Sequence, residues 1–184
     1  MRTISKKFKV FFEGMEQDTD GMCWEFIENC PTHLKILEEC KKFKNWKEYN
    51  SNSTLESGHP HLSEKLKKLK AGVTGRWFTK PTEEHFPTFM EWYDKRFGDY
   101  EPEIRKLDAG SVILPHLHNH EKEKKYLYNM SINHPEGCKF GIKGGGIVPY
   151  HAGDVLKINV HNEHCVWNNS HEDRYHVILG VLDA

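Results

Sequence analysis

The pattern of apolar and polar positions changes near residue 100 of this 184-residue chain. Beyond that point, short segments rich in β-branched and aliphatic residues alternate with turn residues, which is typical of strands joined by tight connections. The pattern predicts eight strands, near residues 102–107, 110–118, 125–133, 138–142, 146–150, 154–160, 164–168 and 174–182. Eight short strands with turn signals between them favour a barrel.

The first hundred residues show helical spacing instead. Apolar residues between positions 20 and 44 recur mostly every three residues, which predicts an amphipathic helix interrupted by Pro31. A second helix is predicted from Thr82, whose hydroxyl can cap its first turn, toward Gly98. Pro87 can delay the start of this helix by one turn. Its aromatic stripe is expected to pack against the barrel.

Weaker signals complete the N-terminal half. They predict an edge strand within residues 1–12 and a basic helix over residues 63–70. We therefore expect a mainly β protein in which residues 1–100 form a mostly helical extension and residues 101–184 form the barrel. A chain of this length buries about 70% of its unfolded surface on folding, which suits one domain with such an extension.

Composition narrows the classes of partner. The net charge of −1 and the pI of about 6.9 give no sign of the basic surface that binds nucleic acid. No run approaches the roughly 18 apolar residues of a membrane span, and the basic N-terminus lacks the apolar core of a secretory signal. The five cysteines form no Cys-X-X-Cys pair and indicate reduced thiols. We expect a cytoplasmic protein that binds neither nucleic acid nor membrane.

Histidines in the predicted strands suggest a metal site. His116 and His118 are two residues apart in one strand and would share a face, and His164 follows a later strand by a tight turn. Neutral imidazoles from two strands can bind iron, zinc, copper or nickel while one side of the ion stays open. Arg174, ten residues after His164, begins a strongly apolar strand, and its guanidinium suits a carboxylate.

Each of these features also has an ordinary structural interpretation. A chain with 13 histidines can produce a His-X-His pair on an exposed strand face by chance. Arg174 could instead form a salt bridge with Glu172 or Asp173. The three glycines at 144–146 are interpreted as a hairpin turn, because the Gly-Lys-Ser/Thr of a phosphate loop is missing. Cys165 alternates away from His164 and is expected in the core.

The C-terminal half resembles a known family, the aspartyl/asparaginyl β-hydroxylase branch of the iron(II)- and 2-oxoglutarate-dependent oxygenases, which is built on a double-stranded β-helix. The resemblance covers roughly residues 104–182. The matching segments are Ala109-Gly-Ser-Val-Ile-Leu-Pro-His116, Pro135-Glu-Gly-Cys-Lys139, Gly153-Asp-Val-Leu156, His164-Cys-Val-Trp-Asn-Asn169 and Arg174.

This resemblance implies that His116 and His164 bind Fe(II) and that Arg174 binds the distal carboxylate of 2-oxoglutarate. Asn129 falls where some relatives place a second polar contact to that cosubstrate. His118 departs from the family pattern, because most of the superfamily has Asp at this position and the β-hydroxylase branch can have Gly. The histidine leaves open a three-imidazole site, a two-histidine site with His118 nearby, or a different metal.

The same segment is similar to the cupins, which share the jelly-roll barrel. The first cupin motif lacks its last glycine, since Met130 stands at that position. The positions that fit the two motifs are Gly110, His116, His118, Glu123, Gly153, Asp154, His164 and Asn168. The resemblance to the β-hydroxylases, by contrast, implies a dioxygenase that hydroxylates an amino acid or amino-acid side chain, in a small molecule or a peptide. The alternatives are a three-histidine cupin enzyme that uses no 2-oxoglutarate and a non-catalytic ligand-binding cupin; the oligomeric state stays open.

Overall fold

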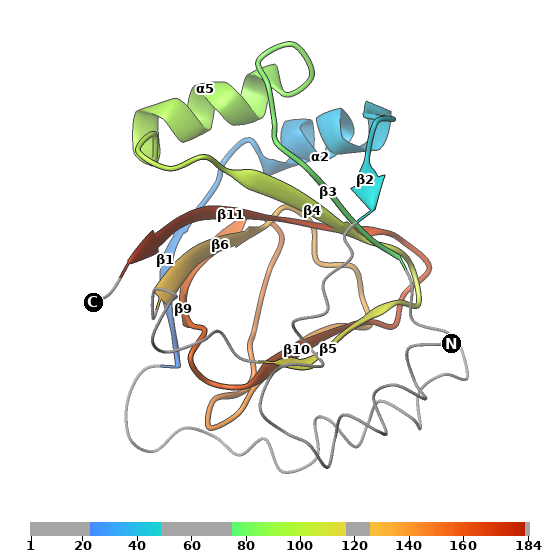
Figure 1. The fold of residues 1–184 in the computed structure, drawn as a ribbon, viewed down its shortest axis with the longest axis vertical. Helices are drawn as coiled ribbons and strands as arrows, with labels where there is room; N and C mark the ends of the chain where they lie inside the picture. Colours follow the sequence, from blue (N-terminus) through green and yellow to red (C-terminus); the bar gives the residue numbers. More distant parts are fainter. Residues whose placement is uncertain (1–22, 49–74, 117–125, 183–184) are drawn as a thin grey trace.

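The computed structural model describes residues 23–48, 75–116 and 126–182. In this part of the chain, two antiparallel β-sheets face each other and two helices cover the outer face of the larger sheet (Figure 1). The helices are α2 (His33–Lys42) and α5 (Pro87–Arg96). The strands are β1 (Trp24–Asn29), β2 (Lys47–Glu48), β3 (Arg76–Thr79), β4 (Glu103–Leu107), β5 (Val112–His116), β6 (Tyr126–Ser131), β7 (Cys138–Ile142), β8 (Gly146–Ile147), β9 (Asp154–Asn159), β10 (His164–Asn168) and β11 (Arg174–Leu182).

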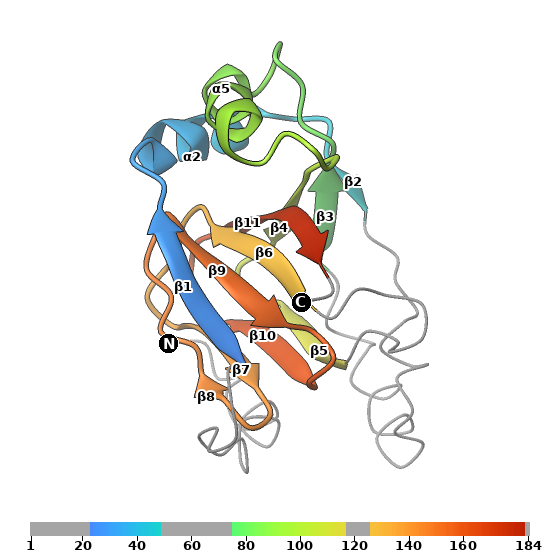
Figure 2. The same ribbon diagram turned by 90° about the vertical axis from the view of Figure 1, so that its left-hand side faces the viewer.

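The larger sheet has the strand order β1-β9-β6-β11-β4-β3-β2, and the smaller sheet has the order β5-β10-β7-β8. The quarter-turned view shows β1, β9 and β6 crossing in front of β10 and β5 (Figure 2). Consecutive strands often lie in different sheets, so side chains far apart in sequence meet between the two layers. This arrangement places any site formed by β10 and β11 between the sheets.

The eight strands predicted beyond residue 100 are confirmed. The hairpin turn predicted at the three glycines is also confirmed. β7 and β8 pair antiparallel across residues 143–145, and the Gly145 N–H donates to the Ile142 carbonyl at 2.9 Å. Gly144 has a φ of 84°, a conformation that glycine adopts without steric cost. The mainly β fold with helices is therefore confirmed as two sheets, and closure of these sheets into a barrel stays a prediction.

The helix predicted over residues 20–44 is wrong in its first half. Trp24–Asn29 forms β1, which pairs with β9 at the edge of the larger sheet, and the helix begins only at His33, after Pro31. Pairing with a preformed sheet edge overrides a helical pattern that proline already interrupts.

The second helix begins at Pro87, one turn later than Thr82, as the proline allowed. The predicted cap is wrong, because α5 has no capping hydrogen bond from its own N-cap residue, Phe86. A carboxylate from the other helix replaces it. Glu39 of α2 accepts the backbone N–H groups of Thr88 and Phe89 at 3.0 and 3.1 Å. A negative charge at this position also suits the positive end of the helix dipole.

The larger sheet has a hydrophobic core on each face. Along β11, the side chains of Tyr175, Val177 and Leu179 pack in the cluster beneath the helices. The alternate positions lie between the sheets, and there the strand carries buried polar groups as well as apolar ones. The cluster between the sheets consists of Cys23, Leu107, Ile113, Leu127, Phe140, Ile142, Val148, Tyr150, Leu156, Ile158, Val160 and Val166.

Residues 1–22, 49–74, 117–125 and 183–184 lie outside the described part of the chain. The edge strand predicted within residues 1–12, the basic helix over residues 63–70 and His118 therefore fall there. The division at residue 100 stays a prediction, and β1, β2 and β3 from the N-terminal hundred join the same sheet as β4 and β11. Among the described helices, none is both long and apolar enough to cross a bilayer.

Candidate active site

The two histidines predicted to bind a metal occupy facing positions on neighbouring strands. His164, the first residue of β10, is the register partner of His116, the last residue of β5. The register shifts between them and the next pair, Val166 with Ile113, so β5 holds one extra residue in this interval. Such a β-bulge resets the alternation of the strand. Pro115, which has no N–H to donate, falls within it.

The imidazole of His164 is buried and held in one orientation. Its Nδ1 lies 2.7 Å from the carbonyl oxygen of Asn162. Because a carbonyl only accepts hydrogen bonds, Nδ1 carries the proton that it donates to this oxygen. The ring of Phe140 stacks on the imidazole at 6.0 Å between centroids, with the two planes 8° apart. A backbone acceptor on the distal nitrogen is a common way to orient a metal-binding histidine.

Arg174 is completely buried at the start of β11. Only 1% of its surface is exposed, and its Nη1 lies 2.9 Å from Nδ1 of His176. Its Nε and Nη2 have no hydrogen-bond partner among the described residues. Burial lowers the pKa of the guanidinium, but arginine stays charged in proteins. A buried cation with two unused donors is costly, so this position calls for an anionic ligand.

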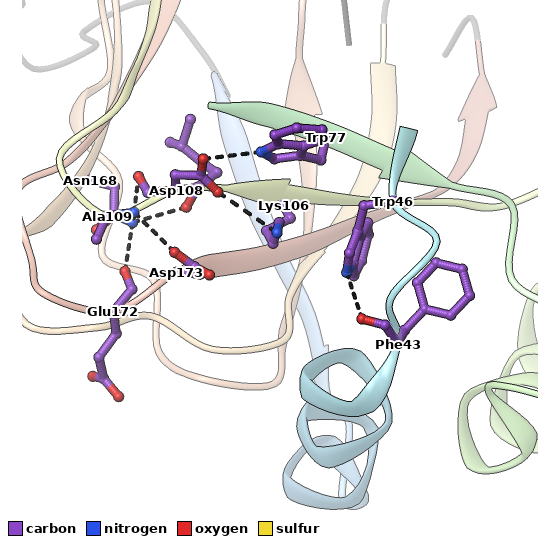
Figure 3. Close-up of polar contacts among 10 residues, drawn as sticks. Phe43, Trp46, Trp77, Lys106, Asp108, Ala109, Asn168, Glu172 and Asp173 are labelled. Atoms are coloured by element: carbon purple, nitrogen blue, oxygen red, sulfur yellow. Dashed lines mark hydrogen bonds and ion pairs between the residues drawn. The ribbon is translucent and has the colours of Figure 1, made fainter. Parts of the chain in front are cut away.

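The salt bridge considered for Arg174 does not form in the described structure. Asp173 instead accepts the backbone N–H of Ala109 at 3.1 Å, and the carbonyl oxygen of Glu172 accepts a hydrogen bond from Asn168 at 2.8 Å (Figure 3). Asp173 therefore serves the turn that precedes β5, and the Glu172 backbone serves the turn between β10 and β11. Arg174 points to the other side of this turn, into the space between the sheets.

Asn168 joins the ends of the strands that carry the candidate residues. Its side chain is fully buried, and its Nδ2 donates to the carbonyl oxygens of Leu107, Asp108 and Glu172 at 2.8–3.3 Å. Its Oδ1 accepts hydrogen bonds from Cys138 and Ser170. One amide thus links the β4–β5 turn, the end of β7 and the β10–β11 turn. Next to this amide, Lys106 of β4 places its Nζ 5.5 Å from the ring centre of Trp46 and 5.3 Å from that of Trp77 (Figure 3).

His176 is an uncharged neighbour of Arg174. It is 7% exposed, and its Nδ1 must accept from the guanidinium, which leaves the proton on Nε2. Burial holds its pKa well below the ordinary value, and the charges of Arg174, Arg105 and Arg76 add to this effect. The imidazole is therefore neutral at physiological pH.

A pocket between the two sheets brings the candidate residues together. His164, Asn129 and Arg174 all line it. The remaining lining residues are Arg76, Arg105, Ile113, Leu127, Phe140, Ile158, Val160, Val166, His176 and Ile178. Among the described residues, three arginines and no carboxylate contribute to this lining, although Arg105 also pairs with Glu103 at 2.9 Å. The pocket suits a small anion with an apolar middle.

Comparison with known proteins places this pocket in a family. A family model described as Aspartyl/Asparaginyl beta-hydroxylase matches residues 34–183. The chain belongs to the aspartyl/asparaginyl β-hydroxylase family. The match includes β10, β11 and every candidate residue of the pocket. No curated protein sequence matches the chain.

Two solved structures share the fold of this β-hydroxylase family member, and a third is similar to part of it. The non-heme α-ketoglutarate-dependent epimerase SnoN from nogalamycin biosynthesis is 10% identical and aligns over 93% of this chain and 80% of its own, with a TM-score of 0.54. The carbocyclase SnoK from the same biosynthesis is 12% identical over 96% and 83%, with a TM-score of 0.52. A 2OG-Fe(II) oxygenase family protein from Burkholderia pseudomallei is 12% identical over 64% and 77%, with a TM-score of 0.41.

The residues expected to bind the metal and the cosubstrate in this β-hydroxylase family member stay predictions. The structure brings His164, Arg174 and Asn129 to one pocket and pairs the backbone of His116 with that of His164. His118 lies outside the described residues. The described side chains contain no group of three His, Cys, Asp or Glu that could hold a metal. The predicted metal ligands include His116 and His118, and the side chains of these two residues are not among the described ones.

The sequence analysis did not predict two buried residues in or next to the pocket, His176 and Tyr150. His176 is two residues after Arg174, so strand alternation alone places both on one face and was a usable signal. Tyr150 lies in the connection before β9, and no sequence pattern connects it with Asn129, whose Oδ1 accepts its hydroxyl at 3.0 Å.

Proposed function

We propose that this protein is an iron(II)- and 2-oxoglutarate-dependent dioxygenase that hydroxylates an amino acid or an amino-acid side chain. We also infer that the two facing sheets are the double-stranded β-helix of that class. The observation that carries the proposal is Arg174, a buried guanidinium whose Nε and Nη2 have no partner among the described residues, in the same pocket as a histidine that a backbone carbonyl holds in one orientation. Membership of the β-hydroxylase family supports it.

The residues present fit the distal carboxylate of 2-oxoglutarate. A guanidinium offers parallel N–H groups that match the two oxygens of a carboxylate. The unused Nε and Nη2 atoms of Arg174 can provide such a pair. Asn129 lines the same pocket and is 5% exposed. Its Oδ1 is already occupied by Tyr150, so its Nδ2 remains as a further donor.

The residues present also fit a ferrous ion. With Nδ1 turned to the Asn162 carbonyl, His164 can offer its Nε2 as a ligand, and the register partner His116 can supply a second imidazole from the adjacent strand. His118 is the third candidate. When bound, iron and 2-oxoglutarate would supply the oxidation together with dioxygen, of which one oxygen atom enters succinate as the keto acid loses carbon dioxide and the other enters a C–H bond of the substrate.

The chain itself contributes binding, orientation and exclusion of water. Arg174 and Asn129 anchor the acid at the inner end of the pocket. Phe140 and the carbonyl of Asn162 fix the plane and the proton of His164. Ile113, Leu127, Ile158, Val160, Val166 and Ile178 provide apolar walls that keep the pocket dry, and this strengthens each charged contact within it.

Turnover of 2-oxoglutarate tests the proposal directly. Purified protein supplied with Fe(II), ascorbate and 2-oxoglutarate is expected to release succinate even without the primary substrate, and candidate peptides or amino acids should accelerate this release. Metal binding with no succinate under any of these conditions would instead support the three-histidine cupin enzyme or the non-catalytic ligand-binding cupin. His118, a third imidazole in place of a carboxylate, is the feature that favours those alternatives.

The cellular setting is part of the proposal. All five cysteines are buried, and none of them forms a disulfide with another described residue, which supports a reducing compartment such as the cytoplasm. We expect a small-molecule or peptide substrate rather than nucleic acid or membrane. The oligomeric state is left open.

A further inference from the structure

We propose that Tyr150 is a positioning residue for the cosubstrate carboxylate. It holds the Asn129 amide with its nitrogen toward the pocket, and it lies against the guanidinium of Arg174. This inference rests on the proposed function. It extends that function to a residue that does not itself line the described pocket.

The first observation is the hydrogen bond between the two side chains. The Tyr150 hydroxyl donates to Oδ1 of Asn129 at 3.0 Å, and both residues are 5% exposed. An asparagine amide has one accepting end and one donating end. With its oxygen on the phenol, Asn129 presents only N–H groups to the pocket. A ligand carboxylate can only accept, so this is the orientation that suits it.

The second observation is the contact with the arginine. The central carbon of the Arg174 guanidinium lies 5.8 Å from the centre of the Tyr150 ring, within the range of a cation–π interaction. The ring thus faces the same group that provides the other donors for the carboxylate. Tyr150 contacts both members of the predicted acid-binding set, one through its hydroxyl and one through its ring.

Packing fixes the tyrosine in this position. Its ring meets Phe140 edge-on at 5.7 Å and stacks on His134 at 5.8 Å. Phe140 in turn stacks on His164. The tyrosine therefore belongs to a continuous aromatic group that extends from the candidate metal ligand to the candidate carboxylate site.

A purely structural tyrosine would leave a different signature. Phenylalanine fills nearly the same volume, so the hydroxyl is the only part that Tyr150→Phe removes. If the hydroxyl serves only the fold, its loss changes stability and affects all ligands alike. If it orients Asn129, its loss weakens only ligands that carry the distal carboxylate. The difference between two keto acids is thus the decisive readout.

Equilibrium binding provides this readout without turnover. The protein is supplemented with Zn²⁺, which has no redox chemistry, and titrated by calorimetry with 2-oxoglutarate and with 2-oxobutanoate, which lacks the distal carboxylate. Tyr150→Phe is expected to raise the Kd for 2-oxoglutarate roughly fivefold, the value of one hydrogen bond, and to leave the Kd for 2-oxobutanoate unchanged. Tyr93→Phe, which removes a hydroxyl bonded to the Tyr100 carbonyl beneath the helices, is the matched control.

The outcomes separate the two levels of the proposal. If the unaltered protein binds both acids equally, the proposed function itself is wrong and the inference is lost with it. If the unaltered protein prefers 2-oxoglutarate but Tyr150→Phe retains that preference, or weakens both acids equally, only the positioning role is wrong.

A second variant keeps the idea testable if Tyr150→Phe does not fold. Asn129→Asp retains an acceptor for the phenol but replaces the donor that faces the pocket with a negative oxygen. It is expected to lose 2-oxoglutarate binding at least tenfold and to keep 2-oxobutanoate binding. Retained affinity for 2-oxoglutarate in Asn129→Asp would show that the amide does not face the ligand.

Discussion

At the scale of single residues, Arg174 combines a stability cost with a binding function. Its Nε and Nη2, which have no partner among the described residues, would gain hydrogen bonds when an acid enters the pocket. A charged hydrogen-bonded contact contributes about 1.5–3 kcal/mol. Arg174→Ala is therefore expected to raise the 2-oxoglutarate concentration needed for half-maximal succinate release by at least roughly tenfold. Unchanged dependence on the keto acid would remove the main support for the assignment.

Arg174→Met separates this role from folding. Methionine keeps much of the side-chain volume and removes a buried unpaired charge, a type of change that often stabilises a protein. The ligand-free variant is thus expected to unfold at an equal or higher temperature than the unaltered protein, while 2-oxoglutarate no longer raises its Tm. A large loss of stability would mean that Arg174 supports the fold instead.

Sequence reasoning proposed His164 and Arg174 because each begins a recognisable strand and falls in a segment that matches the family, and it proposed Asn129 only through the family resemblance. It found neither His176 nor Tyr150. His176 required attention to the face of the strand, and Tyr150 required knowledge of which loop lies against β6. A long-range contact of this kind, 21 residues apart, leaves no periodic trace in the sequence.

At the scale of elements, Asn168 determines how three connections meet. Alanine at this position would leave the carbonyls of Leu107, Asp108 and Glu172 without the donor that they share. Buried groups that lose their partners cost about 1–3 kcal/mol each, and relaxation recovers part of this. Asn168→Ala is expected to lower the free energy of unfolding by about 2–4 kcal/mol, measured by urea titration.

The neighbouring asparagine offers a matched control. Asn169 is less buried than Asn168, and Asn169→Ala is expected to change stability by less than about 0.5 kcal/mol. Equal effects of the two substitutions would contradict the linking role of Asn168.

The cupin resemblance marks Asn168 as part of a motif. The structure shows hydrogen bonds to the ends of neighbouring strands.

The strands of the C-terminal half could be predicted because apolar alternation and turn residues both mark them. β1 could not, since its six residues form a strand through pairing with β9, which local sequence does not encode. The bulge in β5 was equally hidden. Strict alternation would set Ile113 and His116 on opposite faces, because they are three residues apart. The extra residue is visible only in the pairing with β10.

At the scale of the whole molecule, the buried His176 and the half-buried His134 make stability depend on pH. Burial, with a smaller contribution from Arg174, lowers the pKa of His134 from 6.5 to about 4, and the pKa of His176 lies well below 6.5. Both remain neutral in the folded protein while the unfolded chain takes up protons. The free energy of unfolding that depends on these two histidines is therefore fully present above about pH 6.5, and it decreases as the pH falls toward 4.

The slope of this loss can reach about 1.4 kcal/mol per pH unit for each histidine that stays neutral. Urea unfolding at pH 7.5, 6 and 5 measures it. His134→Gln is expected to make the slope shallower, whereas the same change at the exposed His171 should leave it unaltered. A stability that is constant from pH 7.5 to 5 would show that neither histidine remains neutral on folding.

The two faces of β11 have a consequence for how such chains can diverge. Tyr175, Val177 and Leu179 face the helices while Arg174, His176 and Ile178 face the pocket. Inserting or deleting a single residue in the turn at 169–173 would exchange the two faces of the strand, burying the Arg174 cation under the helices and turning aliphatic and aromatic groups into the pocket. We therefore expect homologous chains to keep the length of this turn constant and to vary most at positions such as His171, whose side chain is exposed.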